Sequence, residues 1–531
     1  MTPSAALRMT ALLALWLTPS LLRAQEPAWE TVRLDLDVRL HPDEERLEGD
    51  ATLRLRPVGD AASELALSVG EAIAIRAVSS GATGPAFTAA IDSAASGALL
   101  RFERPVAADE EVEIGVAFAS TGRGFQMVVD HTAAFASWAR SWYPHAATFA
   151  APGTTRIAMP AAWRAIASGG LVDRDVQHGR AVETWESERP LARSFAAGPY
   201  AVATHASGGR TIGTYLLTRR QRADEYAAAL ADVMAALEAR FGPYPYPGYA
   251  LVEVPAGLAG WTGSSEQGFF MARSDALEGP VNLPLLAHEL AHGWWGNWVR
   301  AVMPGSLMTG EALAQHAAVI AIDELEGEAA AVEFLRFSRE GYSWIQSARG
   351  YWALKLAGHD RPLAELTGDG QDHNLADAKG HWVYAMLRRR LGDERFFDAL
   401  RDVLAEYGGG TLSLPQLRAA FLAAAPDDEG LEGFLAQWLD RAGAPLLSVN
   451  WEDASADGRH AAAVTIRQRT PEPYRLRIAL GVESAAGLRV HEVELVEATT
   501  RIELAADGPP TGIVENVGHG ILMWESAYCP E

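Results

Sequence analysis

The most informative stretch of this chain runs from His288 to Asn297 and reads HELAHGWWGN. Its two histidines stand one helical turn apart, so on a helix both imidazoles project from one face and can share a metal ion. Glu289 would lie beside them, where its carboxylate can act as a general base. Farther along the chain, Glu311 is the candidate third ligand. These four side chains are sufficient to build a hydrolytic zinc site.

The residues around this stretch predict the helices that such a site requires. Asn282 is a suitable N-cap, Pro284 falls in the first turn, and apolar residues follow at helical spacing. Met303-Pro304-Gly305 then predicts a turn, and the alanine-rich segment 311–320 predicts a second helix. Two helices can therefore deliver all three ligands to one ion.

The chemistry expected of this set is peptide-bond hydrolysis. Two imidazoles and one carboxylate would hold one zinc ion and leave a position open for a zinc-activated water, with Glu289 as general base. The alternative is a helix that is simply packed in a core. That arrangement would bury two imidazoles and two carboxylates without compensation, which is costly unless they bind something.

The same residues carry a resemblance to a known family. HELAHGWWGN followed by Glu311 resembles the gluzincin zinc aminopeptidases, the membrane alanyl aminopeptidase (aminopeptidase N) family, whose motif reads HELAHQWFGN before a ligand glutamate inside NEG. Here Thr309-Gly310-Glu311-Ala312 occupies the second place. Further similar stretches are Trp142-Tyr143-Pro144, FGPYPYP at 241–247 and FLAQWL at 434–439. The resemblance implies one zinc ion, a peptide substrate and removal of N-terminal residues.

Patterning and resemblance together predict an α+β multidomain protein. Alternating apolar and polar residues indicate strands at 31–40 and 51–56, and this alternation returns after about residue 445. The expected parts are a signal peptide at 1–24, an N-terminal β-sheet domain at 25–207, a zinc peptidase domain at 208–444 and a small C-terminal β-sandwich at 445–531. The resemblance implies that the third part is a thermolysin-like mixed α/β domain. It also implies a short form, without the helical C-terminal domain that larger members carry.

Aminopeptidase specificity requires an acidic group that holds the free α-ammonium of the substrate. The family uses the glutamate of a GxMEN motif, and Gly263 to Gln267 reads GSSEQ in the matching place. The resemblance thus implies that Glu266 is the amine anchor. An ordinary loop carboxylate is the alternative, because Ser265 and Gln267 replace the methionine and asparagine of the motif.

A sharper departure concerns the tyrosine that stabilises the oxyanion in the family's YxKG pattern. This chain has Asp377-Ala378-Lys379-Gly380, so an aspartate stands in that position. An ionised carboxylate cannot donate a hydrogen bond and repels developing negative charge, at a cost of about 3 kcal/mol or more. His381, one helical turn along, is a candidate substitute donor. Two alternatives therefore stay open: a non-catalytic or weakly active zinc-binding relative that binds peptides, and an endopeptidase.

The length, charge and N-terminal sequence of the chain indicate its domain number, its binding partners and its location. The chain has 531 residues and a formal net charge of −23, which suggests several domains and disfavours nucleic-acid binding. Arg8, an apolar stretch at 9–17 and a cleavage position after Ala24 predict an exported protein, periplasmic or extracellular, whose leader is removed. A leader that stays attached as an anchor is the alternative. No second apolar segment reaches membrane-spanning length, so no stable membrane insertion is expected after leader removal. The sequence does not indicate the oligomeric state.

Overall fold

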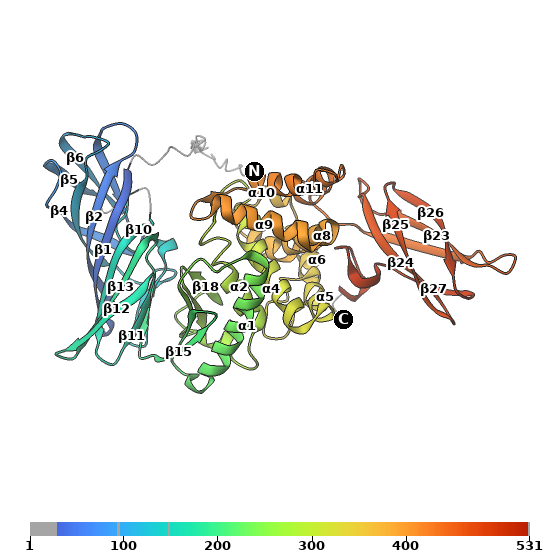
Figure 1. The fold of residues 1–531 in the computed structure, drawn as a ribbon, viewed down its shortest axis with the longest axis horizontal. Helices are drawn as coiled ribbons and strands as arrows, with labels where there is room; N and C mark the ends of the chain where they lie inside the picture. The colour runs from blue at the N-terminus through green and yellow to red at the C-terminus, as the bar shows by residue number, and fades with distance from the viewer. Residues whose placement is uncertain (1–28, 93–95, 147–148, 529–531) are drawn as a thin grey trace, which may run out of the picture.

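The computed structural model describes residues 29–92, 96–146 and 149–528 and shows an α+β protein of three parts (Figure 1). A β-rich part lies at one end, a part with all the α-helices of the described residues lies in the middle, and a smaller β part lies at the other end. The expected signal peptide, residues 1–24, falls outside the described residues. Within them, no helix is both long and apolar enough to cross a membrane.

The N-terminal part consists of three sheets. A seven-stranded sheet has the order β12-β13-β10-β1-β2-β7-β4, and two smaller sheets have the orders β3-β6-β5 and β11-β14-β9-β8. The strands predicted at 31–40 and 51–56 are confirmed as parts of β1 and β2, an antiparallel pair that buries alternate residues. The strand bounds are β1 (Trp29–His41), β2 (Arg46–Pro57), β3 (Ala62–Ser68), β4 (Ile73–Ser80), β5 (Phe87–Asp92), β6 (Gly97–Val106), β7 (Val112–Ser120), β8 (Met127–Val129), β9 (Ala134–Ala136), β10 (Ala151–Pro160), β11 (Arg164–Ala167), β12 (Gly170–Gln177), β13 (Arg180–Leu191) and β14 (Phe195–Gly198).

The middle part contains a five-stranded sheet with the order β15-β16-β17-β19-β18. Its strands are β15 (Ala201–Ser207), β16 (Arg210–Leu216), β17 (Gly248–Val254), β18 (Gly263–Glu266) and β19 (Phe269–Arg273). β15 precedes the expected domain boundary at 207/208, yet it pairs along its length with β16. Leu251 and Phe270 on one face join the core formed with the helices, whereas Val252 and Met271 on the other face join the core of the N-terminal part. The sheet is therefore buried on both sides.

The helices of the middle part pack on that first face and on one another. α1 buries one helical stripe, with Tyr226, Leu230, Val233, Leu237 and Phe241 all inside. A π-helical turn, η6 (Ala376–Gly380), separates α7 from α8. The bounds are α1 (Ala223–Phe241), α2 (Leu283–Ala291), α3 (Ser306–Thr309), α4 (Glu311–Glu326), α5 (Glu328–Phe337), α6 (Ala348–Leu356), α7 (Asp372–Leu375), α8 (His381–Leu391), α9 (Asp393–Tyr407), α10 (Leu414–Ala424) and α11 (Leu431–Leu439), with the short strands β20 (Arg300–Ala301) and β21 (Thr411–Leu412) paired between them.

The C-terminal part consists of two three-stranded sheets, with the orders β22-β23-β26 and β25-β24-β27. Val464 of the first and Ile478 of the second lie in one hydrophobic core. The strand bounds are β22 (Leu447–Asp453), β23 (His460–Gln468), β24 (Leu476–Ser484), β25 (Gly487–Leu495), β26 (Thr499–Ala506) and β27 (Pro510–Val514). After β27 the chain returns to the helices, where Glu525 pairs with Arg336 at 2.8 Å and the Trp352 indole donates to the Met523 carbonyl.

Candidate metal centre

Two packed helices, α2 and α4, position the three predicted ligands. α2 begins as its sequence predicts, because Asn282 caps it by accepting a hydrogen bond from the Leu285 amide and Pro284 lies in its first turn. His288 lies in the last turn of α2 and His292 at its C-cap. Glu311 is the first residue of α4. The helices are buried against each other, so the ligand positions are set by the core.

The donor atoms of these three residues converge. His288 Nε2 and His292 Nε2 lie 3.2 Å apart, and each is 3.6 Å from Glu311 Oε2. The three atoms are therefore close enough together to bind one metal ion. Two imidazoles and a carboxylate are the donor set of hydrolytic zinc enzymes.

The outer nitrogens of both imidazoles also have the partners that a metal site needs. His288 Nδ1 lies 2.9 Å from Gln315 Oε1, and His292 Nδ1 lies 3.0 Å from the Trp295 carbonyl oxygen. Both partners are acceptors, so each Nδ1 keeps its proton and each Nε2 is the nitrogen that can bind an ion at the shared point. The residues present therefore fit a zinc ion. Gln315 stands one turn after Glu311 on α4, a spacing from which its place could have been predicted.

Electrostatics make the cluster attractive to a cation. Burial alone would raise the pKa of Glu311, but His292 and His288 hold it well below its ordinary value of 4.5. Burial alone would lower the pKa of His288, but its contact with Glu311 raises it to about 9. Three groups that share protons in this way can exchange them for one divalent ion.

Glu289 lies next to this cluster and is almost fully buried, with a relative exposure of 6%. Burial raises the pKa of its carboxyl, while the two neighbouring imidazoles act in the opposite direction. Gly263 of β18 packs on it so closely that a Cβ there would lie 2.1 Å from Glu289 Oε1. Because Gly263 has no side chain, the carboxyl of Glu289, the predicted general base, can lie against the edge strand β18 beside the candidate ligands.

Glu266, at the end of β18, lies at the junction with the N-terminal part and is fully buried. Ser194 Oγ donates to Oε2 at 2.6 Å, and Ser264 Oγ donates to Oε1 at 3.2 Å. Burial raises the pKa of this carboxyl to about 7. The residue that aligns with the amine anchor is therefore enclosed by hydroxyl groups, one of which comes from the N-terminal part.

Asp377 and His381 lie on consecutive helical segments but in different surroundings. Asp377, on the π-helical turn η6, is buried and accepts a hydrogen bond from Gln346 Nε2 at 2.7 Å. Burial raises the pKa of Asp377 to about 6, with His288 and Glu311 among its electrostatic neighbours. The aspartate thus lies near the metal ligands. A π-helical turn commonly marks a functional position in a helix.

His381 is fully buried, and its Nδ1 faces the backbone carbonyl of Asp377. Burial lowers the pKa of His381 to about 4, which keeps the ring neutral. Within the described ranges it forms no hydrogen bond or ion pair with the three candidate ligands. Asp377 thus lies near the metal cluster, whereas His381, as far as the described residues show, is not bonded to any of its ligands.

The segment 338–347, between α5 and α6, supplies two residues that sequence reasoning missed. Tyr342 donates a hydrogen bond from its hydroxyl to Gln315 Oε1 at 2.7 Å, and Gln346 is the donor to Asp377. Neither residue lies in a motif or on a periodic helix, so no local signal places it at the site.

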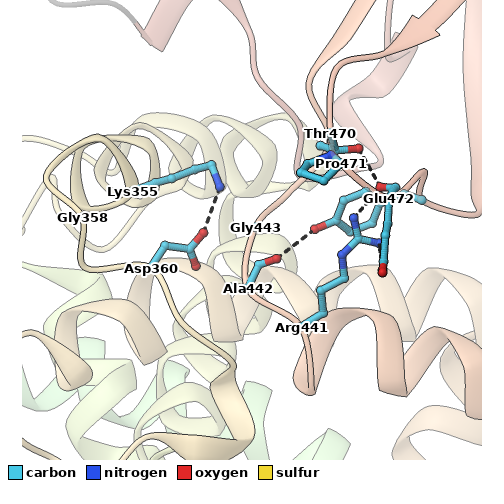
Figure 2. Close-up of a pocket in the computed structure, with 10 residues that line it drawn as sticks. Lys355, Gly358, Asp360, Arg441, Ala442, Gly443, Thr470, Pro471 and Glu472 are labelled. Carbon is cyan, nitrogen blue, oxygen red and sulfur yellow. Dashed lines mark hydrogen bonds and ion pairs between the residues drawn. The ribbon is translucent and has the colours of Figure 1, made fainter. Parts of the chain in front are cut away.

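A cavity of about 510 Å³ lies elsewhere, between the helical part and the C-terminal sheets (Figure 2). Its lining includes Lys355, Asp360, Arg441 and Tyr474. Lys355 and Asp360 form an ion pair at 3.1 Å, and Arg441 stacks on the Tyr474 ring. None of the candidate ligands or substrate residues lines this cavity.

Comparison of the sequence with known proteins finds similarity to peptidases in the segment that contains the candidate metal centre. The peptidase family M1 domain matches residues 231–438, a segment that contains all three candidate ligands and Glu289. Aminopeptidase N of Lactobacillus delbrueckii subsp. lactis is 25% identical over 266 residues, which are 47% of this chain and 30% of that protein. Aminopeptidase N of Streptomyces lividans is 25% identical over 300 residues, which are 52% of this chain and 33% of that protein. The mouse (Mus musculus) aminopeptidase RNPEPL1 is 25% identical over 306 residues, which are 54% of this chain and 40% of that protein.

The chain therefore covers less than half of the length of each of these relatives. The matched segment nevertheless holds the helix pair, the three converging donor atoms and the buried carboxylate beside them. Residues 231–438 thus match the peptidase family M1 domain, and the chain is similar in sequence to proteins named aminopeptidase N.

Proposed function

We propose that this protein is an exported zinc metallopeptidase, an aminopeptidase that hydrolyses N-terminal residues from peptides. One observation carries the proposal. The Nε2 atoms of His288 and His292 and Glu311 Oε2 converge within hydrogen-bonding or ion-pair distance, and the buried Glu289 carboxylate lies beside them. These residues would hold one zinc ion.

When bound, zinc polarises the substrate carbonyl and makes water a stronger acid. Glu289 accepts the proton of the attacking water and later delivers it to the leaving amine, so one carboxyl serves as base and then as acid. Gly263 keeps this carboxyl close to β18, where an extended peptide can lie along the strand edge. Gln315 and the Trp295 carbonyl hold the two imidazoles in the orientation that leaves Nε2 free.

Two observations support aminopeptidase specificity: Glu266 stands where the resembled family has its amine anchor, and the similar proteins are named aminopeptidases. A carboxylate at this place would pair with the α-ammonium of a substrate. Glu266 is fully buried beside Ser194 and Ser264, so a substrate must displace a hydroxyl contact to reach it. This favours short, unhindered N-termini.

A second candidate function is a zinc-binding relative that binds peptides with weak turnover or none. Asp377 supports it, because a buried carboxylate near the ligands repels the negative charge of an oxyanion instead of donating a hydrogen bond to it. An endopeptidase is the third candidate, supported by the enclosure of Glu266.

One digestion experiment separates the three. The zinc-loaded protein is incubated with a mixed peptide library and with the same library N-acetylated, and the bonds that disappear are read by mass spectrometry. An aminopeptidase removes N-terminal residues from free peptides only. Cleavage of internal bonds in both libraries identifies an endopeptidase, and full zinc occupancy without cleavage identifies the binding protein.

Export rests on the leader-like residues 1–24, which lie outside the described residues. Secretion from a host cell with a mature N-terminus at Gln25 supports it. Retention of the full leader on a cytosolic product contradicts it.

A further inference from the structure

The segment 338–347 contacts a residue that orients a candidate metal ligand, and it does so through Tyr342. Tyr342 is partly buried, and its ring packs against Phe334 of α5 with centroids 5.6 Å apart. Its hydroxyl donates to Gln315 Oε1, and the same oxygen accepts from His288 Nδ1. One amide oxygen thus receives two hydrogen bonds, one from the segment 338–347 and one from a candidate metal ligand.

The orientation of the Gln315 amide decides which nitrogen of His288 carries the proton. With Oε1 toward the ring, Nδ1 is protonated and Nε2 offers a lone pair to the ion. If the amide were reversed, its NH2 would donate to Nδ1 and the proton would move to Nε2, which then could not bind a metal.

The Gln315 amide has few hydrogen bonds besides those to Tyr342 and His288. Gln315 is fully buried, and its Nε2 finds no hydrogen-bond partner within the described residues. Among the residues that the structure describes, two bonds to Oε1 fix the orientation of the amide. Without the Tyr342 hydroxyl, His288 alone would have to orient the amide, and a lone imidazole can do so either as donor or as acceptor.

We propose that Tyr342 is a positioning residue for the metal centre: its hydroxyl fixes the Gln315 amide with the oxygen toward His288 and thereby selects the tautomer that binds the ion. This inference rests on the zinc site of the proposed function. It assigns a role to a residue outside every motif of the chain. Burial raises the pKa of Tyr342 well above its ordinary value, with Asp377 and Glu289 adding to the effect, so the phenol stays a neutral donor.

The test compares zinc affinity in Tyr342→Phe and in the wild-type protein by competition with a chromophoric chelator. We expect affinity to fall about 10-fold, the lower end of the range for partners of metal-bound histidines. Selective 15N labelling of histidine gives a second readout above pH 9, where the metal-free His288 ring is neutral: the appearance of its Nε2-protonated tautomer in the variant. Tyr226→Phe is the matched control, because that buried hydroxyl also donates to one oxygen, the Leu277 carbonyl at 2.8 Å, but lies away from the ligands. Its zinc affinity should equal that of the wild type.

A double substitution excludes a merely structural effect. In Gln315→Glu both terminal atoms are acceptors, so no reversed orientation exists and Tyr342→Phe should change zinc affinity less than about twofold in that background. An unchanged affinity in the single variant, or an equal loss in both backgrounds, overturns the inference. These outcomes leave the proposed peptidase intact. A wild-type protein that does not bind zinc refutes both, whereas zinc binding without hydrolysis refutes only the peptidase.

Discussion

The metal-binding half of the candidate site and its substrate-facing half differ in how closely they follow the resemblance. The three ligands are in place on α2, at its C-cap and on α4, and both orienting acceptors, Gln315 on α4 and the Trp295 carbonyl just after α2, are in place too. On β18 and η6, the groups expected to meet the substrate are a carboxyl enclosed by serines and an aspartate in place of a phenol. A metal accepts few donor sets and geometries, so its ligands form a recognisable motif. Substrate contacts have no such fixed pattern, and here they depend on neighbours from distant segments.

The largest expected effect lies in the metal-binding half. Glu289→Gln removes the proton acceptor but keeps the size of the side chain, and should lower kcat by about 1,000-fold while zinc stays bound. Steady-state rates and zinc content measured on the same preparation check this. An unchanged kcat in this variant would show that Glu289 takes no part in the reaction and that the metal-binding half consists of the ligands alone.

In the substrate-facing half, Glu266→Gln should change the pH dependence of stability. The folded pKa of about 7 lies above the ordinary 4.5, so between these values the unfolded chain releases a proton that the folded protein keeps, and wild-type stability falls as pH rises. In the Glu266→Gln variant this loss of stability with rising pH is absent, because glutamine does not ionise. Its free energy of unfolding relative to wild type should therefore increase by about 2–3 kcal/mol from pH 5 to pH 8, measured by urea denaturation. A constant difference would show that Glu266 ionises normally.

Gly263→Ala tests the contact between the two halves. The added methyl would lie 2.1 Å from Glu289 Oε1, so the carboxyl or the strand must shift. We expect kcat to fall about 100-fold, as for a displacement of about 1 Å at a reacting group, with zinc affinity unchanged. Gly257→Ala, where a Cβ would meet nothing within 4 Å, is the matched control. Equal rates for both variants would contradict the close packing of Glu289 on β18.

The smallest effect is expected at Asp377. Asp377→Asn keeps an oxygen that can accept the Gln346 hydrogen bond but removes the charge that repels an oxyanion. If the site is an active peptidase, kcat should rise about 10-fold with little change in KM. A lower kcat would mean that the substrate-facing half has been rebuilt around the carboxylate.

The prediction of fold from sequence succeeded where one face of an element is buried. The alternation of β1 and β2 appears as expected, because period and burial are coupled in such elements. Which segments pair or dock with one another has no such local signal. β15 pairs with β16, and residues after β27 return to the helices, since pairing partners and docking surfaces are properties of the folded chain.

The candidate site divides in the same way. The sequence by itself determined His288, His292, Glu311 and Glu289, because helical spacing fixes the directions of side chains on one helix and a metal restricts the donor types. Only the tertiary structure decided that Ser194 encloses Glu266 and that Tyr342 reaches Gln315. Those contacts join segments far apart in the chain, and their distances follow from the packing of whole elements instead of from any local pattern.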